Sequence, residues 1–286
     1  MNDKTLSTNE LIDALENAGR TPDLDLIRTC VARVAELEPA LLDLLRTTPE
    51  ERYDDMEDEM NDPRIYSDVH AGYLLITARS LAALPIFGEI FRDEERQDLF
   101  EWFAPELHHY GSAALPVFTE LLLDEAGYLY GRSWAAAILR KIAQLEPEQR
   151  TAVIATLHQL LPPVPPGKVE ARDEMWTWAV LELGKLGDKT HLEQIEALFA
   201  AGAIDTWIIG EYEDYLELLE EDPGDMSPSY DIIEIYTELH DEAASEAEVR
   251  AEWARRNEAK TVLPARQKQN RGRVAGHTGQ AGRARR

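Results

Sequence analysis

The 286-residue chain contains a single cysteine, Cys30. One cysteine excludes an intrachain disulfide and a zinc site built from several cysteines. Cys30 lies between Ile27, Val31 and Val34, which share one side of an expected helix. We therefore expect a buried, unreactive thiol.

The sequence also lacks long apolar runs and strand patterns. No apolar stretch approaches the length of a membrane span, and residues 1–4 lead into no apolar segment typical of a signal peptide. No sustained alternation of apolar and polar residues occurs, and no Asn-Gly or Asp-Gly turn joins two such segments. The expectation is an all-α, soluble protein of the cytoplasm with no membrane contact.

Basic residues are scarce over most of the chain. Residues 1–249 carry 18 Lys and Arg against 53 Asp and Glu, a net charge of −35, whereas residues 250–286 carry a net charge of +9. Phosphate binding requires positive surface, so the acidic part is unsuited to nucleic acid. It is suited to a basic partner, although a solubility role explains the charge equally well.

Helical periodicity is the main signal present. Residues 83–90 (ALPIFGEI) and 114–121 (ALPVFTEL) match at an offset of 31 positions, with apolar residues spaced for one helix face. Proline near the start of each segment suits the first turn of a helix. A period near 31 predicts helical hairpins that bury their apolar faces by stacking on their neighbours.

Further apolar stripes extend the pattern, at 134–145, 153–161, 176–186 and 192–199. The fold class predicted is all-α, a HEAT-like α-α superhelix (α-solenoid) with a disordered basic C-terminal tail. The organisation expected is N-terminal helices and an acidic linker over 1–62, HEAT-like repeats over 63–222, a C-terminal helix over 223–259 and the tail over 260–286.

Two segments resemble a bacterial domain-of-unknown-function family with a HEAT-like fold. They are residues 65–75 (IYSDVHAGYLL), followed by Ala83-Leu84-Pro85, and residues 131–139 (GRSWAAAIL). The likeness spans about 6–220 and implies a cytoplasmic helical-repeat protein without implying an activity. Some relatives end in a cysteine-rich zinc motif, and the absence of cysteine here removes that metal role.

No catalytic or metal-ligating constellation is expected. Glu106 and His109 have the spacing of paired ligands on a helix, but no second Glu-x-x-His occurs, so we interpret His108 and His109 as surface or groove residues. The Gly131-Arg132-Ser133 segment is not preceded by a strand, as a nucleophile elbow requires. We therefore expect a non-enzymatic protein without cofactor or metal.

Residues 211–222 combine tyrosines with carboxylates. The apolar residues Tyr212, Tyr215, Leu216 and Leu219 are expected on one helix face and most acids on the other. Tyrosines bordered by acids suit a basic protein partner. The favoured alternative is a terminal capping helix that buries its apolar face. The candidate partner-binding residues are Glu211, Tyr212, Asp214 and Tyr215.

The tail gives a second functional hypothesis. An arginine-rich, flexible segment could contact nucleic acid while the acidic part docks elsewhere. It could also associate with the acidic part of its own chain, or have no role. The candidate residues for nucleic-acid binding are Arg271, Arg273, Arg283, Arg285 and Arg286.

Overall fold

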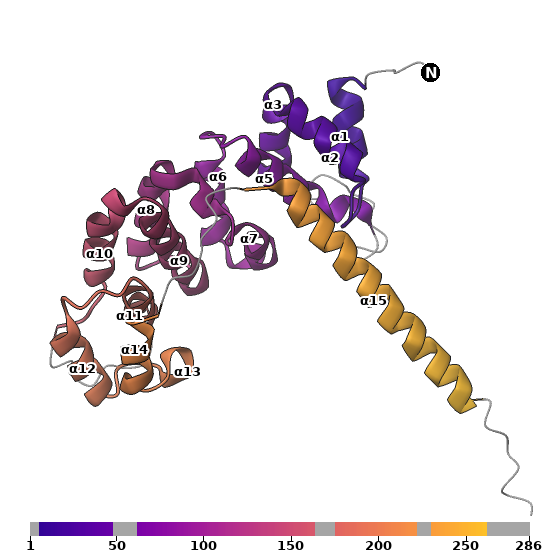
Figure 1. Ribbon diagram of the computed structural model, residues 1–286. Coiled ribbons are helices and arrows are strands. Elements are labelled where there is room, and N and C mark those ends of the chain that lie inside the picture. Colours follow the sequence, from indigo (N-terminus) through magenta and orange to yellow (C-terminus); the bar gives the residue numbers. More distant parts are fainter. Residues whose placement is uncertain (1–5, 48–61, 164–174, 222–229, 262–286) are drawn as a thin grey trace, which may run out of the picture. The chain divides into compact units, whose positions relative to one another are not determined.

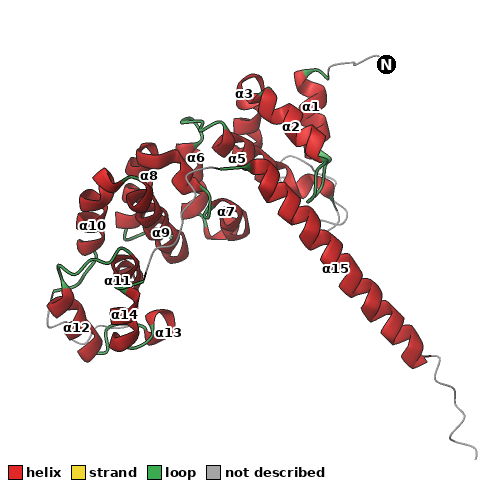
Figure 2. Cartoon of the chain, in the orientation of Figure 1, coloured by secondary structure: helices red, strands yellow, loops and turns green. Residues whose placement is uncertain are grey.

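The computed structural model describes residues 6–47, 62–163, 175–221 and 230–261, and all regular structure among them is helical (Figures 1 and 2). The chain divides into two units, residues 1–237 and 238–286. No helix in the described part of the chain is long and apolar enough to cross a membrane.

Residues 6–47, the first described stretch, form α1 (Thr8–Glu16), α2 (Leu24–Ala32) and α3 (Val34–Arg46). α1 starts at a capping box, in which the Ser7 hydroxyl accepts from the amide of Glu10 and the Glu10 carboxylate accepts from the amide of Ser7. α3 packs against α5, so these helices belong to the same unit as the segments that follow. Cys30 is completely buried, as expected, and burial raises its thiol pKa to about 11.

The two matching sequence segments form two equivalent helices. α6 (Leu84–Arg92) and α8 (Leu115–Leu123) each have nine residues and a proline in the first turn, and they pack against each other. Phe91 of α6 and Phe118 of α8 are fully buried, with ring centroids 5.6 Å apart. The two repeated segments therefore form helices, as predicted, and these helices pack against each other. The same stretch of the chain also forms α5 (Ser67–Thr77), α7 (Gln97–Phe103) and the 3-10 helices η2 (Pro63–Tyr66), η3 (Glu94–Arg96) and η4 (Leu107–Ala114).

The second half of the first unit continues with helices that mostly contact their neighbours in the chain. α9 packs against α8, α10 and α11, and α11 packs against α13 and α14 (Figure 1). The bounds are α9 (Leu129–Leu145), η5 (Pro147–Gln149), α10 (Arg150–His158), α11 (Met175–Lys185), α12 (Leu192–Ala200), α13 (Thr206–Ile209) and α14 (Tyr212–Leu218). α9 approaches the backbone of α6 closely at Gly131. A Cβ at this position would lie 1.8 Å from the carbonyl oxygen of Phe91, so only glycine fits without a shift.

The last helix of the described residues, α15 (Ile232–Thr261), covers most of the segment in which the sequence predicts a C-terminal helix. The division between the two units falls within it, after Thr237. Its first turns belong to the first unit, where Tyr236 is fully buried and bonds to His70 of α5. Residues 262–286 of the expected tail lie outside the described residues.

Candidate partner-binding surface

The segment from Asp205 to Glu221 folds into two short helices joined by a tight turn. Asp205 caps α13 by accepting a hydrogen bond from the amide of Trp207 at 2.9 Å. Gly210, with φ of 90°, ends α13 and redirects the chain. The amide of Glu211 then donates to the Asp214 carboxylate at 2.7 Å, which closes a capping box at the start of α14.

One face of α14 is part of the core. Tyr215 is completely buried and Leu219 is 7% exposed, and both belong to a buried apolar cluster with Val180, Ile195, Leu198 and Ile204. Tyr212 is half-buried, with its ring centroid 5.5 Å from that of Phe199 on α12. The apolar face of α14 thus docks on α11 and α12, as the capping-helix alternative expects.

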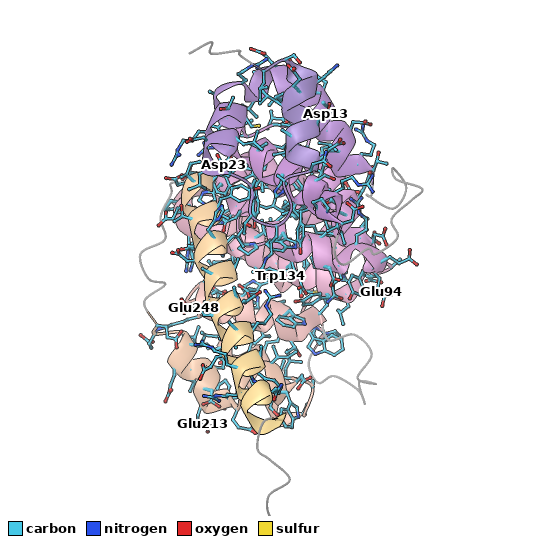
Figure 3. All side chains as sticks on the ribbon, turned by 90° about the vertical axis from the view of Figure 1, so that its right-hand side faces the viewer. Asp13, Asp23, Glu94, Trp134, Glu213 and Glu248 are labelled. Carbon is cyan, nitrogen blue, oxygen red and sulfur yellow. The ribbon has the colours of Figure 1, made fainter. Side chains whose placement is uncertain are left out.

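The opposite face of α14 is exposed and acidic. Glu213 and Glu217 are exposed, and Leu216 lies between them with 39% of its surface accessible. Glu213 is labelled in Figure 3. The spacing of these three residues places them along one side of the helix. Leu216 therefore differs from its expected position, because the tyrosines and Leu219 fill the core side without it. Glu220, which follows α14, is also exposed but pairs with Lys189.

Trp207 is the most exposed large apolar residue in the described part of the chain, with 97% of its surface accessible. It lies on α13, four positions before Glu211, and so within about 15 Å of the start of α14 along the backbone. Residues 205–221 contain seven Asp and Glu and no Lys or Arg. An exposed indole on α13 is therefore followed in the chain by the exposed carboxylates of α14.

The sequence pattern alone did not identify Trp207 as a candidate binding residue. The sequence does indicate a very short helix here, because the capping residue Asp205 and the helix-ending Gly210 enclose only four residues. A helix of one turn cannot direct all its large side chains inward. Its partly buried neighbours, Ile208 and Ile209, leave Trp207 facing out.

The four residues predicted to bind a partner fall into different environments. Glu211 and Asp214 are exposed, but Asp214 accepts the capping bond of α14. Tyr212 is half-buried, and Tyr215 is inaccessible to a partner because the packing of α14 encloses its ring. The candidate nucleic-acid residues Arg271, Arg273, Arg283, Arg285 and Arg286 lie outside the described residues.

His108 and His109 are buried, contrary to the interpretation of these residues as surface or groove side chains. They are 6% and 8% exposed in η4, because this tight helix is enclosed by α5, α8 and α9. Nε2 of His109 lies 3.3 Å from the Glu106 carboxylate. Burial, and then the charges of His109 and Lys141, lower the pKa of His108 to about 4.

Within the described residues, one group of three side chains has the donors and spacing of a metal site, His158, Asp188 and His191. Their positions in the sequence do not predict that these three residues come together. His158 ends α10, whereas Asp188 and His191 lie between α11 and α12. Only folding brings the ring of His158 to the other two.

No family model, curated protein or solved structure gives a significant match to this chain.

Proposed function

We propose that this chain is a non-enzymatic helical-repeat scaffold of the cytoplasm, a HEAT-like solenoid that binds a basic protein segment. Support for the repeat architecture comes from α6 and α8, which share sequence, length and capping proline and pack side by side. The contacts that run from α8 through α9 and α10 to α11 agree with serial stacking.

The observation that carries the binding proposal is the exposure of Trp207. Tryptophan is among the residues that dominate binding energy in protein interfaces. At 97% exposure the indole of Trp207 gains little packing from its own chain. It is therefore free to enter an apolar pocket on another protein.

The charge of the segment that follows Trp207 determines which partner fits. Glu213 and Glu217 are exposed on the outer face of α14, on either side of Leu216. Carboxylates at the rim of an interface accelerate association with a positively charged surface and disfavour an acidic one. The matching partner carries lysine or arginine around an apolar pocket.

Site-specific photo-crosslinking tests this proposal in the full-length protein. A photoreactive residue at the exposed Thr206, next to Trp207 in the chain, should form a defined adduct in native extract, and the same residue at Leu81 should not. Leu81 is a matched control because it is 64% exposed, apolar and remote in sequence, before α6. The partner recovered is then purified for affinity measurements.

With that partner, W207A should weaken binding at least about tenfold, as expected for an interface hot spot. E213K/E217K should weaken binding further and remove its salt dependence, whereas E213Q/E217Q should have a smaller effect. L81A should bind as the unmodified chain does. Unchanged affinity in W207A and E213K/E217K overturns the proposal, and loss of binding only on deletion of 260–286 favours the tail hypothesis.

A further inference from the structure

Three side chains from two helical hairpins converge near the end of α10. Nε2 of His158 lies 2.8 Å from Oδ2 of Asp188, and the ring centroids of His158 and His191 are 3.5 Å apart. One ligand atom from each of the three residues lies within 4.8 Å of the other two.

The turn after α11 sets the position of Asp188. Gly187 has φ of 64°, and the amide of Asp188 donates to the carbonyl of Leu183 at 3.0 Å. This left-handed turn ends the helix and points the next side chain back across it. Asp188 is 4% exposed as a result, and faces His158 rather than solvent.

Thr190 holds two of the three residues in place. Its hydroxyl oxygen lies 2.9 Å from Oδ2 of Asp188 and 3.0 Å from Nδ1 of His191. Hydrogen bonds of this kind orient the carboxylate and imidazole ligands of metal ions.

The protonation state of His158 also suits a ligand. Burial, and then the adjacent His191 ring, lower its pKa, while the Asp188 carboxylate opposes the shift. A neutral imidazole offers a nitrogen lone pair, which a protonated one does not. The pair with Asp188 is then a hydrogen bond between a neutral ring and a carboxylate.

We propose that His158, Asp188 and His191 bind a divalent transition-metal ion, with Zn²⁺ the first candidate. Two imidazoles and one carboxylate are donors that Zn²⁺ accepts, and three protein ligands leave at least one position for water or a partner's side chain. The ion would link α10 to the turn between α11 and α12, two adjacent hairpins of the first unit. This site is independent of the surface at Trp207.

Binding requires only local adjustment. Ligand atoms around tetrahedral Zn²⁺ are separated by about 3.3–3.5 Å, given bond lengths of about 2.0–2.2 Å. His158 and Asp188 must therefore separate slightly, and the Nε2 proton of His158 must leave that nitrogen so that it can bind the ion. His191 and the exposed Thr190 lie on the solvent side, which provides access.

The test uses the full-length chain without an affinity tag, freed of metal and titrated with Zn²⁺ and with Co²⁺. We expect one Zn²⁺ per chain, a Tm that rises with free Zn²⁺, and visible Co²⁺ absorption typical of a low coordination number. H191A is the main variant, because His191 is partly exposed and its loss should disturb the fold little. Its ring contacts the side chains of Thr190 and His158. H158A is the second, and E193Q, which removes an exposed carboxylate two positions from His191, is the matched control.

H191A and H158A should each lower Zn²⁺ affinity at least tenfold, and E193Q should retain it. Circular dichroism of the metal-free variants distinguishes loss of a ligand from loss of the fold. If H158A does not fold, the H191A result alone decides. Absence of stoichiometric Zn²⁺ binding, or binding that H191A leaves unchanged, overturns the proposal.

Discussion

Nδ1 of His70 lies 2.6 Å from the hydroxyl oxygen of Tyr236, 166 positions further along the chain. Nε2 of the same ring lies 2.8 Å from the carbonyl oxygen of Gly19. A carbonyl only accepts, so Nε2 carries the proton and Nδ1 accepts from the tyrosine hydroxyl. One neutral histidine thus connects the loop after α1, helix α5 and the start of α15.

His70 should make folding sensitive to acid. Burial lowers its pKa from 6.5 to about 4, despite the opposing bond to Gly19. The unfolded chain therefore binds a proton that the folded chain does not between these two pH values, and stability falls as pH decreases through this range. The contribution is about 1.4 kcal/mol per pH unit.

Urea unfolding of the unmodified chain and H70Q at several pH values from 7 to 4.5 measures this effect. The free energy of unfolding should fall less steeply with acidification in H70Q than in the unmodified chain, by up to about 1.4 kcal/mol per pH unit. H108Q provides a comparison, because burial also lowers the pKa of His108 to about 4. Parallel stability curves for the unmodified chain and H70Q would contradict the prediction.

Removing the Tyr236 hydroxyl should destabilise the first unit. In Y236F the buried Nδ1 of His70 loses its donor, at a cost of about 1–3 kcal/mol. Y230F is the matched control, since the Tyr230 hydroxyl donates at 3.2 Å to the Tyr73 carbonyl, which also accepts from Thr77. The free energy of unfolding should decrease more in Y236F than in Y230F, and equal values would argue against a special role for the His70 bond.

Gly131 should not tolerate a methyl group. A Cβ there would lie 1.8 Å from the backbone oxygen of Phe91, whose own side chain is fully buried in α6. Backbone in a packed core cannot move aside cheaply, so G131A should cost about 3 kcal/mol or more.

The matched substitution for Gly131 is G88A, also within a helix. Its nearest contact is a side-chain methyl of the half-buried Val117 at 2.7 Å. A valine side chain is stiff, but it can shift at lower cost than backbone, and alanine is favoured over glycine in a helix by up to about 1 kcal/mol. Denaturant unfolding should therefore show G131A to be much less stable than G88A, and similar midpoints would show that α9 can shift on α6.

The Tyr215 hydroxyl should be dispensable for stability. It is buried and has no hydrogen-bond partner among the described residues. Y215F should leave the free energy of unfolding unchanged or raise it by about 1 kcal/mol, whereas Y215A should lower it by about 3–5 kcal/mol. Calorimetric unfolding distinguishes these outcomes, and marked destabilisation by Y215F would reveal a partner for the hydroxyl.

The sequence predicted structure correctly where a short stretch of residues is enough to specify a helix and its buried face. The match between 83–90 and 114–121 identified α6 and α8, because an apolar stripe and a first-turn proline are sufficient to specify a short helix. Cys30 was placed in the core for the same reason. The α14 segment was recognised as an amphipathic helix, but its periodicity alone assigned Leu216 to the wrong face.

The candidate sites were harder to predict. Four positions at the start of α14 (Glu211, Tyr212, Asp214 and Tyr215) were selected for their charge and tyrosines. Trp207 is a candidate only because no other part of the fold covers it, and the sequence does not show this. His158 and Asp188 are 30 positions apart, and their contact depends on how two hairpins stack. No spacing rule connects such residues before the helices are docked.

By itself the sequence determined the helical character of the chain, its acidic charge and the equivalence of α6 and α8, since these follow from local periodicity and composition. Tertiary structure alone decided that Tyr215 is buried, that Trp207 is exposed, and that His70 meets Tyr236 and His158 meets Asp188. Burial and convergence depend on which helix faces dock together, and that is settled by packing over the whole unit rather than by any single segment.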